Sequence, residues 1–163
     1  MAEKQAALVI GAGDATGGAI AKRFAREGFE TCVVRRHADK LQPLVDEISA
    51  AGGTAHAFGT DARKEEEMIA LIDQIETDIA PLGVAVFNIG ANVNFPITET
   101  TSRVYFKVWE MAAFAGFLTG REVARKMTPR GRGTIIFTGA TASVRGGSGF
   151  SAFSGAKHAL RAL

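Results

Sequence analysis

Short apolar runs alternate along this chain with longer segments in which apolar residues recur every three or four positions. The short runs predict β-strands at residues 6–10, 31–34, 54–58, 84–87 and 134–138. The periodic segments predict helices at residues 16–27, 39–51, 63–79 and 101–127. Strands that alternate with helices are typical of βαβ units. We therefore expect an α/β fold with a doubly wound parallel sheet, covered on both faces in three αβα layers.

Composition limits the number of domains and the kinds of partner. The chain has 163 residues, 47% of them hydrophobic and 22% charged, which suits one core and a single domain over residues 1–163. A net charge of +2 without a long basic run argues against a nucleic-acid partner. The lone Cys32 lies in an apolar run and the N-terminus lacks an export signal, so we expect an inert core thiol and a cytoplasmic protein. The isolated His37 and His56 predict no metal site.

The predicted helix at residues 101–127 is apolar around nearly its whole circumference. Between residues 104 and 118 its only charges are Lys107 and Glu110. The stretch from Glu110 to Arg121 is shorter than the roughly 20 residues that cross a membrane, so we expect no membrane span. One sheet cannot bury every face of such a helix. We expect an interface in a homo-oligomer, and the alternative is a helix buried all round within one monomer.

A glycine-rich turn follows the first predicted strand and leads into a helix. A dinucleotide pyrophosphate binds at a helix N-terminus, where unpaired N–H groups point outward, and glycine is needed where a side chain would block that approach. The sequence therefore predicts a dinucleotide site in this turn. Its residues are Gly11, Gly13, Asp14, Ala15, Thr16 and Gly17.

The run from Ile10 to Gly17 resembles the TGxxxGxG turn of short-chain dehydrogenases/reductases, with Ile10 in place of the threonine and Ala15 in place of the middle glycine. The resemblance implies a Rossmann-type fold and extends over essentially the whole chain. It adds cofactor-binding positions: Asp61, where the family binds adenine; Asn88 and Gly90, where the family has NNAG; and Lys157, where it has YxxxK.

Two arginines favour one nicotinamide cofactor over the other. A carboxylate about 20 residues beyond the glycine turn would bind the ribose 2′-hydroxyl of NAD, whereas arginine accommodates the 2′-phosphate of NADP. Arg35 and Arg36 end the second predicted strand, while Glu30 begins it and Asp39 already belongs to the next helix. NADP(H) is therefore predicted in preference to NAD(H). The alternative for the arginine pair is an ordinary solvated loop.

The resemblance also implies which catalytic positions this chain has kept. Of the family's tyrosine, serine, asparagine and lysine, only the lysine remains, as Lys157; Phe153, Ala140 and Ala113 replace the others. A phenol has a pKa near 10 and needs a nearby cation to exchange protons at neutral pH, but Phe153 has no hydroxyl at all. The usual proton relay is therefore excluded, and Lys157 is expected to bind the nicotinamide ribose. The sole tyrosine, Tyr105, falls far from this motif in sequence.

Two functions remain open from the sequence. The first is an NADP(H)-dependent oxidoreductase that exchanges hydride with a carbonyl or alcohol, its proton coming from water or from the substrate itself. The second is a sensor or dimer partner that binds NADP(H) without turnover; a structural fragment without cofactor is a third possibility. A small apolar substrate or ligand is expected, from the pocket candidates Val93, Phe95, Val144 and Phe150. Residues 159–163 lie within an apolar helical pattern without a cap, so truncation inside the helix of Lys157 is expected.

Overall fold

Five parallel strands form one sheet in the computed structural model, which describes residues 4–163. Their order is β3-β2-β1-β4-β5. Their bounds are Ala6–Ile10 (β1), Glu30–Arg35 (β2), Thr54–Gly59 (β3), Leu82–Phe87 (β4) and Thr134–Phe137 (β5). Each predicted strand is present, with its ends shifted by two residues at most. The α/β prediction is confirmed because every neighbouring pair of strands is parallel.

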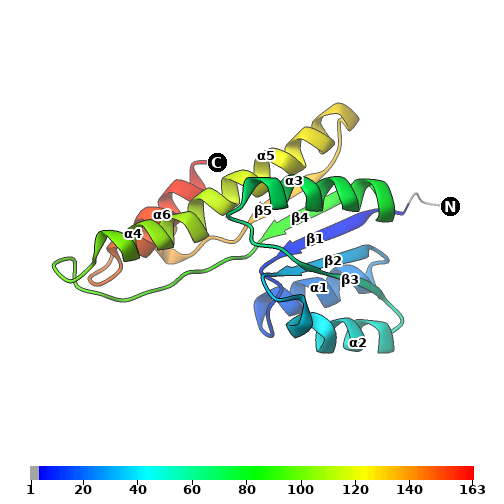
Figure 1. Ribbon diagram of the computed structural model, residues 1–163, viewed down its shortest axis with the longest axis horizontal. Coiled ribbons are helices and arrows are strands. Elements are labelled where there is room, and N and C mark those ends of the chain that lie inside the picture. The colour runs from blue at the N-terminus through cyan, green and yellow to red at the C-terminus, as the bar shows by residue number, and fades with distance from the viewer. Residues whose placement is uncertain (1–3) are drawn as a thin grey trace.

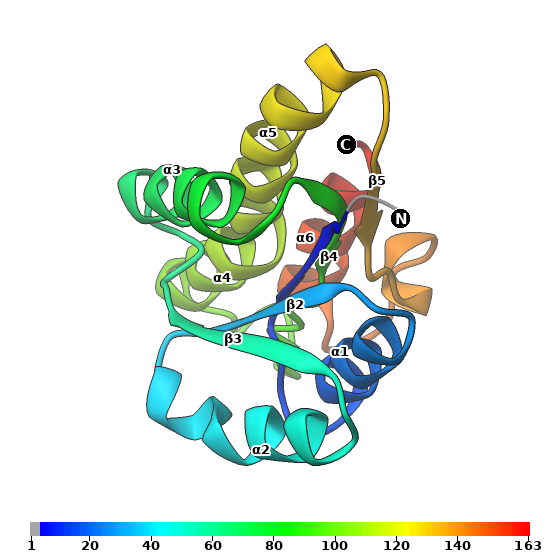
Figure 2. The ribbon, with the colours of Figure 1, turned by 90° about the vertical axis from the view of Figure 1, so that its right-hand side faces the viewer.

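Helices cover both faces of the sheet (Figure 1). The α-helices are Thr16–Arg26 (α1), Gln42–Ala50 (α2), Glu65–Gln74 (α3), Ser102–Trp109 (α4), Ala115–Met127 (α5) and Ser151–Arg161 (α6). Short 3-10 turns lie at Ala38–Leu41, Thr128–Arg130 and Thr141–Ser143, and π-helical segments at Ile75–Ile79 and Glu110–Phe114. Figure 2 shows α1 and α2 on one side of the sheet and α3 to α6 on the other.

The two faces of the sheet carry separate cores because successive strand residues point to opposite sides. Leu8 and Cys32 pack with residues of α3 and α5, whereas Val9 and Val33 pack with residues of α1 and α2. All five residues of β1 are buried, as expected for the central strand of a parallel sheet. Burial raises the pKa of Cys32 to about 12, so its thiol is inert, as predicted.

Three predicted helices differ in detail from the observed ones. Pro43 has no N–H to donate to the carbonyl of Asp39, so the α-helix begins at Gln42 and a 3-10 turn precedes it. Helix α3 starts at Glu65, two residues later than predicted, because Lys64 is extended. The predicted helix 101–127 is continuous, but the π-helical segment Glu110–Phe114 separates α4 from α5.

The α4–α5 helix is not buried all round. Phe106 is 67% exposed, and Tyr105, Trp109 and Phe117 are also exposed. The rings of Trp109, Phe114 and Phe117 stack in sequence, and Arg121 lies 5.3 Å from the Phe117 ring. Residues 4–163 alone therefore do not bury this helix on every side. Among residues 4–163, no helix is both long and apolar enough to span a bilayer.

Candidate functional site

The glycine turn lies where the strand order reverses, between β1 and β4, which is where ligands bind in open α/β sheets. Gly11 has a φ of +84°, and a Cβ there would stand 2.7 Å from the carbonyl oxygen of Asn88. Asn88 joins the two strand ends, since its backbone N–H donates to Ile10 at 2.8 Å and its side-chain amide donates to Gly11 at 3.4 Å. Asn88 therefore holds the shape of the turn.

The glycines of this turn have different roles. A Cβ at Gly17 would lie 2.2 Å from the Gly11 oxygen, and one at Gly18 would lie 2.6 Å from the Gly13 oxygen. Gly17 is thus required by the protein's own packing. At Gly13 nothing lies within 4 Å of the added Cβ, so open space adjoins it. The sequence analysis did not include Gly18, whose only sequence signal is its place at the start of the helix.

The first turn of α1 can receive an anion. No side chain caps this helix, and its N-cap residue is Ala15. Its first N–H groups therefore have no side-chain acceptor, and they carry the positive end of the helix dipole. The open space at Gly13 and these N–H groups fit the pyrophosphate of a dinucleotide.

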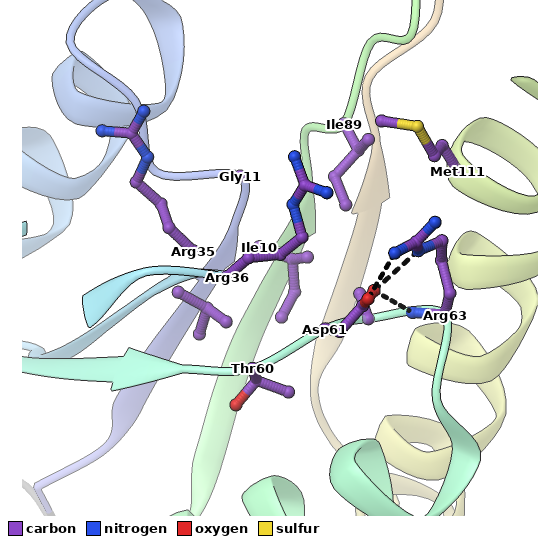
Figure 3. Close-up of a pocket in the computed structure, with 11 residues that line it drawn as sticks. Ile10, Gly11, Arg35, Arg36, Thr60, Asp61, Arg63, Ile89 and Met111 are labelled. Atoms are coloured by element: carbon purple, nitrogen blue, oxygen red, sulfur yellow. Dashed lines mark hydrogen bonds and ion pairs between the residues drawn. The ribbon is translucent and has the colours of Figure 1, made fainter. Parts of the chain in front are cut away.

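A cavity of about 160 Å³ lies beside the turn, at the carboxyl ends of β1, β2 and β3. Figure 3 shows the side chains of Arg35 and Arg36 diverging within it. Arg35 Nη1 lies 3.6 Å from Asp14 Oδ1, whereas Arg36 is exposed and makes no ion pair with any residue in the described range 4–163. The residues that line the cavity are Ile10, Gly11, Val34, Arg35, Arg36, Thr60, Asp61, Ala62, Arg63, Ile89 and Met111.

Asp61 lines this cavity as part of an ion pair. Arg63 Nε donates to Asp61 Oδ1 at 2.8 Å, and a second bond joins Arg63 Nη2 to Oδ2. These bonds hold the pKa of Asp61 at about 2, so it is ionised at neutral pH. The sequence analysis missed Arg63, although an arginine two residues after an acid in a turn is a signal for such a pair.

Lys157, at the position where the resemblance implies the family's catalytic lysine, has a buried side chain. Only 3% of it is exposed, and Nζ donates to the carbonyl oxygens of Thr138 at 2.8 Å and Ile89 at 3.2 Å. The ring centroid of Phe153 lies 5.9 Å from Nζ. Burial lowers the pKa of Lys157 from its usual value. The alternative of a simple surface lysine is therefore wrong.

The three substituted positions lie around helix α6, but only two of them line a common cavity. Ala140 and Phe153 line one cavity of about 560 Å³, next to the loop that follows β4. Ala113 lies in the π-helical segment, where it packs with Ala152 and Ala156 of α6. π-Helical turns inside α-helices frequently occur at functional sites. Of the pocket candidates from the sequence, Phe150 lines this cavity, and Val93, Phe95 and Val144 do not.

Two other residues near the motif are placed by tertiary contacts. Tyr105 is distant in sequence, but its hydroxyl would lie 3.0 Å from a Cβ on Gly155 of α6. Gly155 follows Phe153 by two residues, about 200° around the helix, so Tyr105 lies on the side away from Phe153. His158 is exposed and its Nδ1 lies 2.8 Å from the carbonyl oxygen of Ser154, in agreement with a structural role.

Known proteins resemble the chain along its whole length. A family model for short chain dehydrogenases matches residues 5–163. A short-chain dehydrogenase from Rhodopseudomonas palustris is 58% identical with a TM-score of 0.94, and the match covers 97% of this chain and 74% of that one. A metagenomic short-chain oxidoreductase in complex with NADP is 26% identical with a TM-score of 0.91, over 98% and 72% of the two chains.

A curated relative shows how much of such a protein this chain represents. Gluconate 5-dehydrogenase of Gluconobacter oxydans (strain 621H) is 29% identical over 157 residues, and the match covers 96% of this chain and 61% of the relative. The chain therefore spans about three fifths of the length of that enzyme.

Proposed function

The chain belongs to the short-chain dehydrogenase family, and from this premise we propose that it is an NADP(H)-dependent oxidoreductase acting on a carbonyl or alcohol. The observation that carries the proposal is the placement of Lys157. Its amine is buried and held by the carbonyl groups of Ile89 and Thr138, at the carboxyl ends of β4 and β5. The glycine turn and the arginine pair lie at the carboxyl ends of the neighbouring strands β1 and β2. The residues that we propose bind the cofactor thus lie at the carboxyl ends of neighbouring strands.

Residues of this chain fit each part of a nicotinamide dinucleotide, which supplies reversible hydride transfer when bound. Gly13 and the first turn of α1 would hold the pyrophosphate. The cavity that contains Asp61 would hold the adenosine, and Lys157 would hold the nicotinamide ribose.

The preference for NADP(H) would depend mainly on Arg36. Arg35 is partly engaged with Asp14, so a 2′-phosphate would compete with a carboxylate for it. Arg36 has no carboxylate partner in residues 4–163 and presents its planar donors to the cavity. We propose that Arg36 binds the 2′-phosphate and Arg35 contributes a weaker electrostatic attraction.

The proton for carbonyl reduction would come from water or from the substrate. The side chains of Phe153 and Ala140 have no proton to give. The hydroxyl of Ser143 accepts a hydrogen bond from the backbone N–H of Ala140 at 3.0 Å and keeps its own proton, but a hydroxyl is a poor acid. Thr141 lines the cavity, but a hydroxyl is a poor acid without a paired base. The lack of a side-chain proton donor at Phe153 and Ala140 favours a second candidate, a protein that binds NADP(H) and an apolar ligand without turnover.

We also propose that the protein is a homo-oligomer that pairs through α4 and α5. The exposed aromatic side chains of these helices form a patch, defined here as Tyr105, Phe106, Trp109 and Phe117. Large exposed apolar patches mark protein interfaces, and an identical patch on a second copy would cover this one about a twofold axis.

Nucleotide titration and a turnover assay test the function together. We expect NADPH to bind the full-length protein more tightly than NADH, and Arg36→Ser to weaken NADPH binding about 10- to 100-fold while leaving NADH unchanged. The matched control is Arg26→Ser, which removes an exposed charge from α1. NADPH oxidation against a panel of aldehydes, ketones and quinones then separates the candidates. NADPH binding without turnover supports the sensor, and no binding of either nucleotide excludes both functions.

A further inference from the structure

The cavity of Ala140 and Phe153 has walls from two loops that lie side by side. One loop follows β4 and contributes Asn92; the other joins β5 to α6 and contributes Arg145 and Phe150. The loops are joined where the N–H of Phe95 donates to the carbonyl of Gly149 at 2.9 Å. The volume of about 560 Å³ falls within the range of roughly 300–1,000 Å³ for small-molecule sites.

Arg145 is the only charged side chain among the residues that line this cavity. Within residues 4–163 its guanidinium makes no ion pair or hydrogen bond, whereas Arg63, Arg121 and Arg130 are each paired with a carboxylate. Among residues 4–163, no aspartate or glutamate lines the cavity. Within the described residues, the exposed Arg145 therefore gives this cavity a positive charge with no carboxylate beside it.

The backbone fixes the base of Arg145. Its N–H donates to the carbonyl of Thr141 at 3.1 Å, which closes a turn at the start of the loop. At the other end of this loop, Gly149 has a φ of +80°, and a Cβ there would lie 2.5 Å from Asn94 Oδ1. The guanidinium therefore extends from an anchored position, which reduces the entropy lost when it binds a ligand.

The remaining walls suit a flat apolar body with polar groups. Phe150 and Phe153 provide aromatic surfaces, and Asn92 and Thr141 provide side chains that can donate hydrogen bonds. Ser154 belongs to the same wall, and its buried hydroxyl has no partner in the described structure. This oxygen is almost completely inaccessible, so the polar contacts open to a ligand come from Asn92, Thr141 and Arg145.

We propose that this cavity binds an aromatic carboxylate, with the acid on Arg145 and the ring against Phe150 and Phe153. The assignment rests on the proposed function and adds a substrate class to it: a carbonyl or alcohol compound that also bears a carboxylate. The fork of guanidinium donors matches the two oxygens of a carboxylate, and planar rings pack on aromatic side chains. The proposal differs from the apolar ligand that the sequence predicts, because it adds a charged group to it.

Binding of two isosteric probes tests the proposal. We would measure dissociation constants of 2-naphthoate and 2-naphthamide by calorimetry on the full-length protein, with and without saturating NADPH. The naphthoate is expected to bind at least about tenfold more tightly, because only it carries the charge. Arg145→Gln is expected to abolish the difference, and Arg145→Lys to retain part of it. The matched control, Arg161→Gln, removes an exposed charge at the far end of α6 and should change neither constant.

The outcomes separate this proposal from the function on which it rests. Equal affinities for the two probes, or no measurable naphthoate binding, overturn the carboxylate assignment even where NADPH binds normally. If 2-naphthoate still binds more tightly than 2-naphthamide to Arg145→Gln, a group other than Arg145 binds the carboxylate. That result also overturns the assignment. Tighter binding of 2-naphthyl phosphate than of 2-naphthoate would reassign the site to phosphates. Failure of NADPH to bind, with probe discrimination intact, contradicts the proposed function alone.

Discussion

At the scale of single residues, the aromatic ring of Phe153 lies beside a buried amine. The ring centroid is 5.9 Å from Lys157 Nζ, and the carbonyl oxygens of Ile89 and Thr138 accept hydrogen bonds from that amine. A hydroxyl added to the ring would gain a cationic neighbour, which favours a phenolate and lowers the pKa of a tyrosine. The surroundings of Phe153 would therefore suit a tyrosine as proton donor, but phenylalanine has no proton to donate.

Restoring the hydroxyl should therefore create or raise carbonyl reductase activity. General acid catalysis contributes about 10²- to 10⁴-fold in rate, so Phe153→Tyr with Ala140→Ser should raise kcat/KM by a factor of this order. Adding Ala113→Asn should raise it further. NADPH oxidation with each carbonyl of the panel measures the effect. Phe150→Tyr, which adds a hydroxyl elsewhere in the same cavity, is the control. Ordinary turnover by the unmodified protein would show that another proton donor operates.

The Asp61–Arg63 ion pair predicts a defined dependence of stability on pH. The pair lowers the pKa of Asp61 to about 2 in the folded protein, against about 3.9 for an unperturbed aspartate. The stabilisation is therefore fully present above about pH 4 and is lost as the pH falls through about 2. Asp61→Asn should lower the free energy of unfolding by about 1–2 kcal/mol at pH 7, with a smaller difference at pH 3. Urea unfolding measures this, and a difference that stays constant with pH would contradict it.

At the scale of elements, the β1–α1 connection contains glycines that are needed for two different reasons. Gly17 allows the helix to start against the backbone of Gly11, while Gly13 borders open space. The first demand concerns packing within the protein and the second concerns room for a ligand. A single substitution at each position can therefore separate stability from binding.

Gly17→Ala should destabilise the fold, whereas Gly13→Ala should weaken cofactor binding. A methyl at Gly17 would lie 2.2 Å from a backbone oxygen, and relieving such overpacking typically costs about 1–3 kcal/mol. A methyl at Gly13 meets no protein atom within 4 Å, so the unfolding midpoint should stay within error of the parent. Thermal unfolding and NADPH titration of both variants measure the two effects. Equal destabilisation of both variants would remove the distinction.

At the scale of the whole molecule, the α4–α5 helix has two faces with different environments. Val108, Ala112 and Leu118 are buried in the protein, while the aromatic patch lies exposed. Figure 1 shows this helix extending beyond the sheet, where the strands cannot cover it. A second copy of the chain would bury the patch.

Charge placed in the patch should therefore separate the copies. Phe106 is 67% exposed, so Phe106→Lys should leave the monomer folded while it introduces an unpaired charge at the proposed interface. Sedimentation velocity of the full-length protein should change from an oligomer to a monomer. Val144→Lys, at an exposed apolar position outside the patch, is the control and should leave the mass unchanged. A monomeric parent protein would contradict the proposal.

Local patterns were sufficient for much of this fold. Strand positions follow from apolar runs, and the glycine turn follows from its place between a strand and a helix. The beginning of α2 was less predictable, because the missing N–H of Pro43 changes the hydrogen bonding of the turn before it. The π-helical segments have no comparable signal, since they depend on how α4, α5 and α6 pack.

The sequence by itself determined the fold class and the position of the glycine turn, because each is a property of neighbouring residues. Tertiary structure alone decided which distant side chains meet. It paired Arg35 with Asp14, brought Tyr105 onto the far side of α6, and left Arg145 as the only charge in the Phe153 cavity. These contacts depend on how crossover connections bring loop ends together at one edge of the sheet. A one-dimensional pattern of hydrophobic positions does not contain that information.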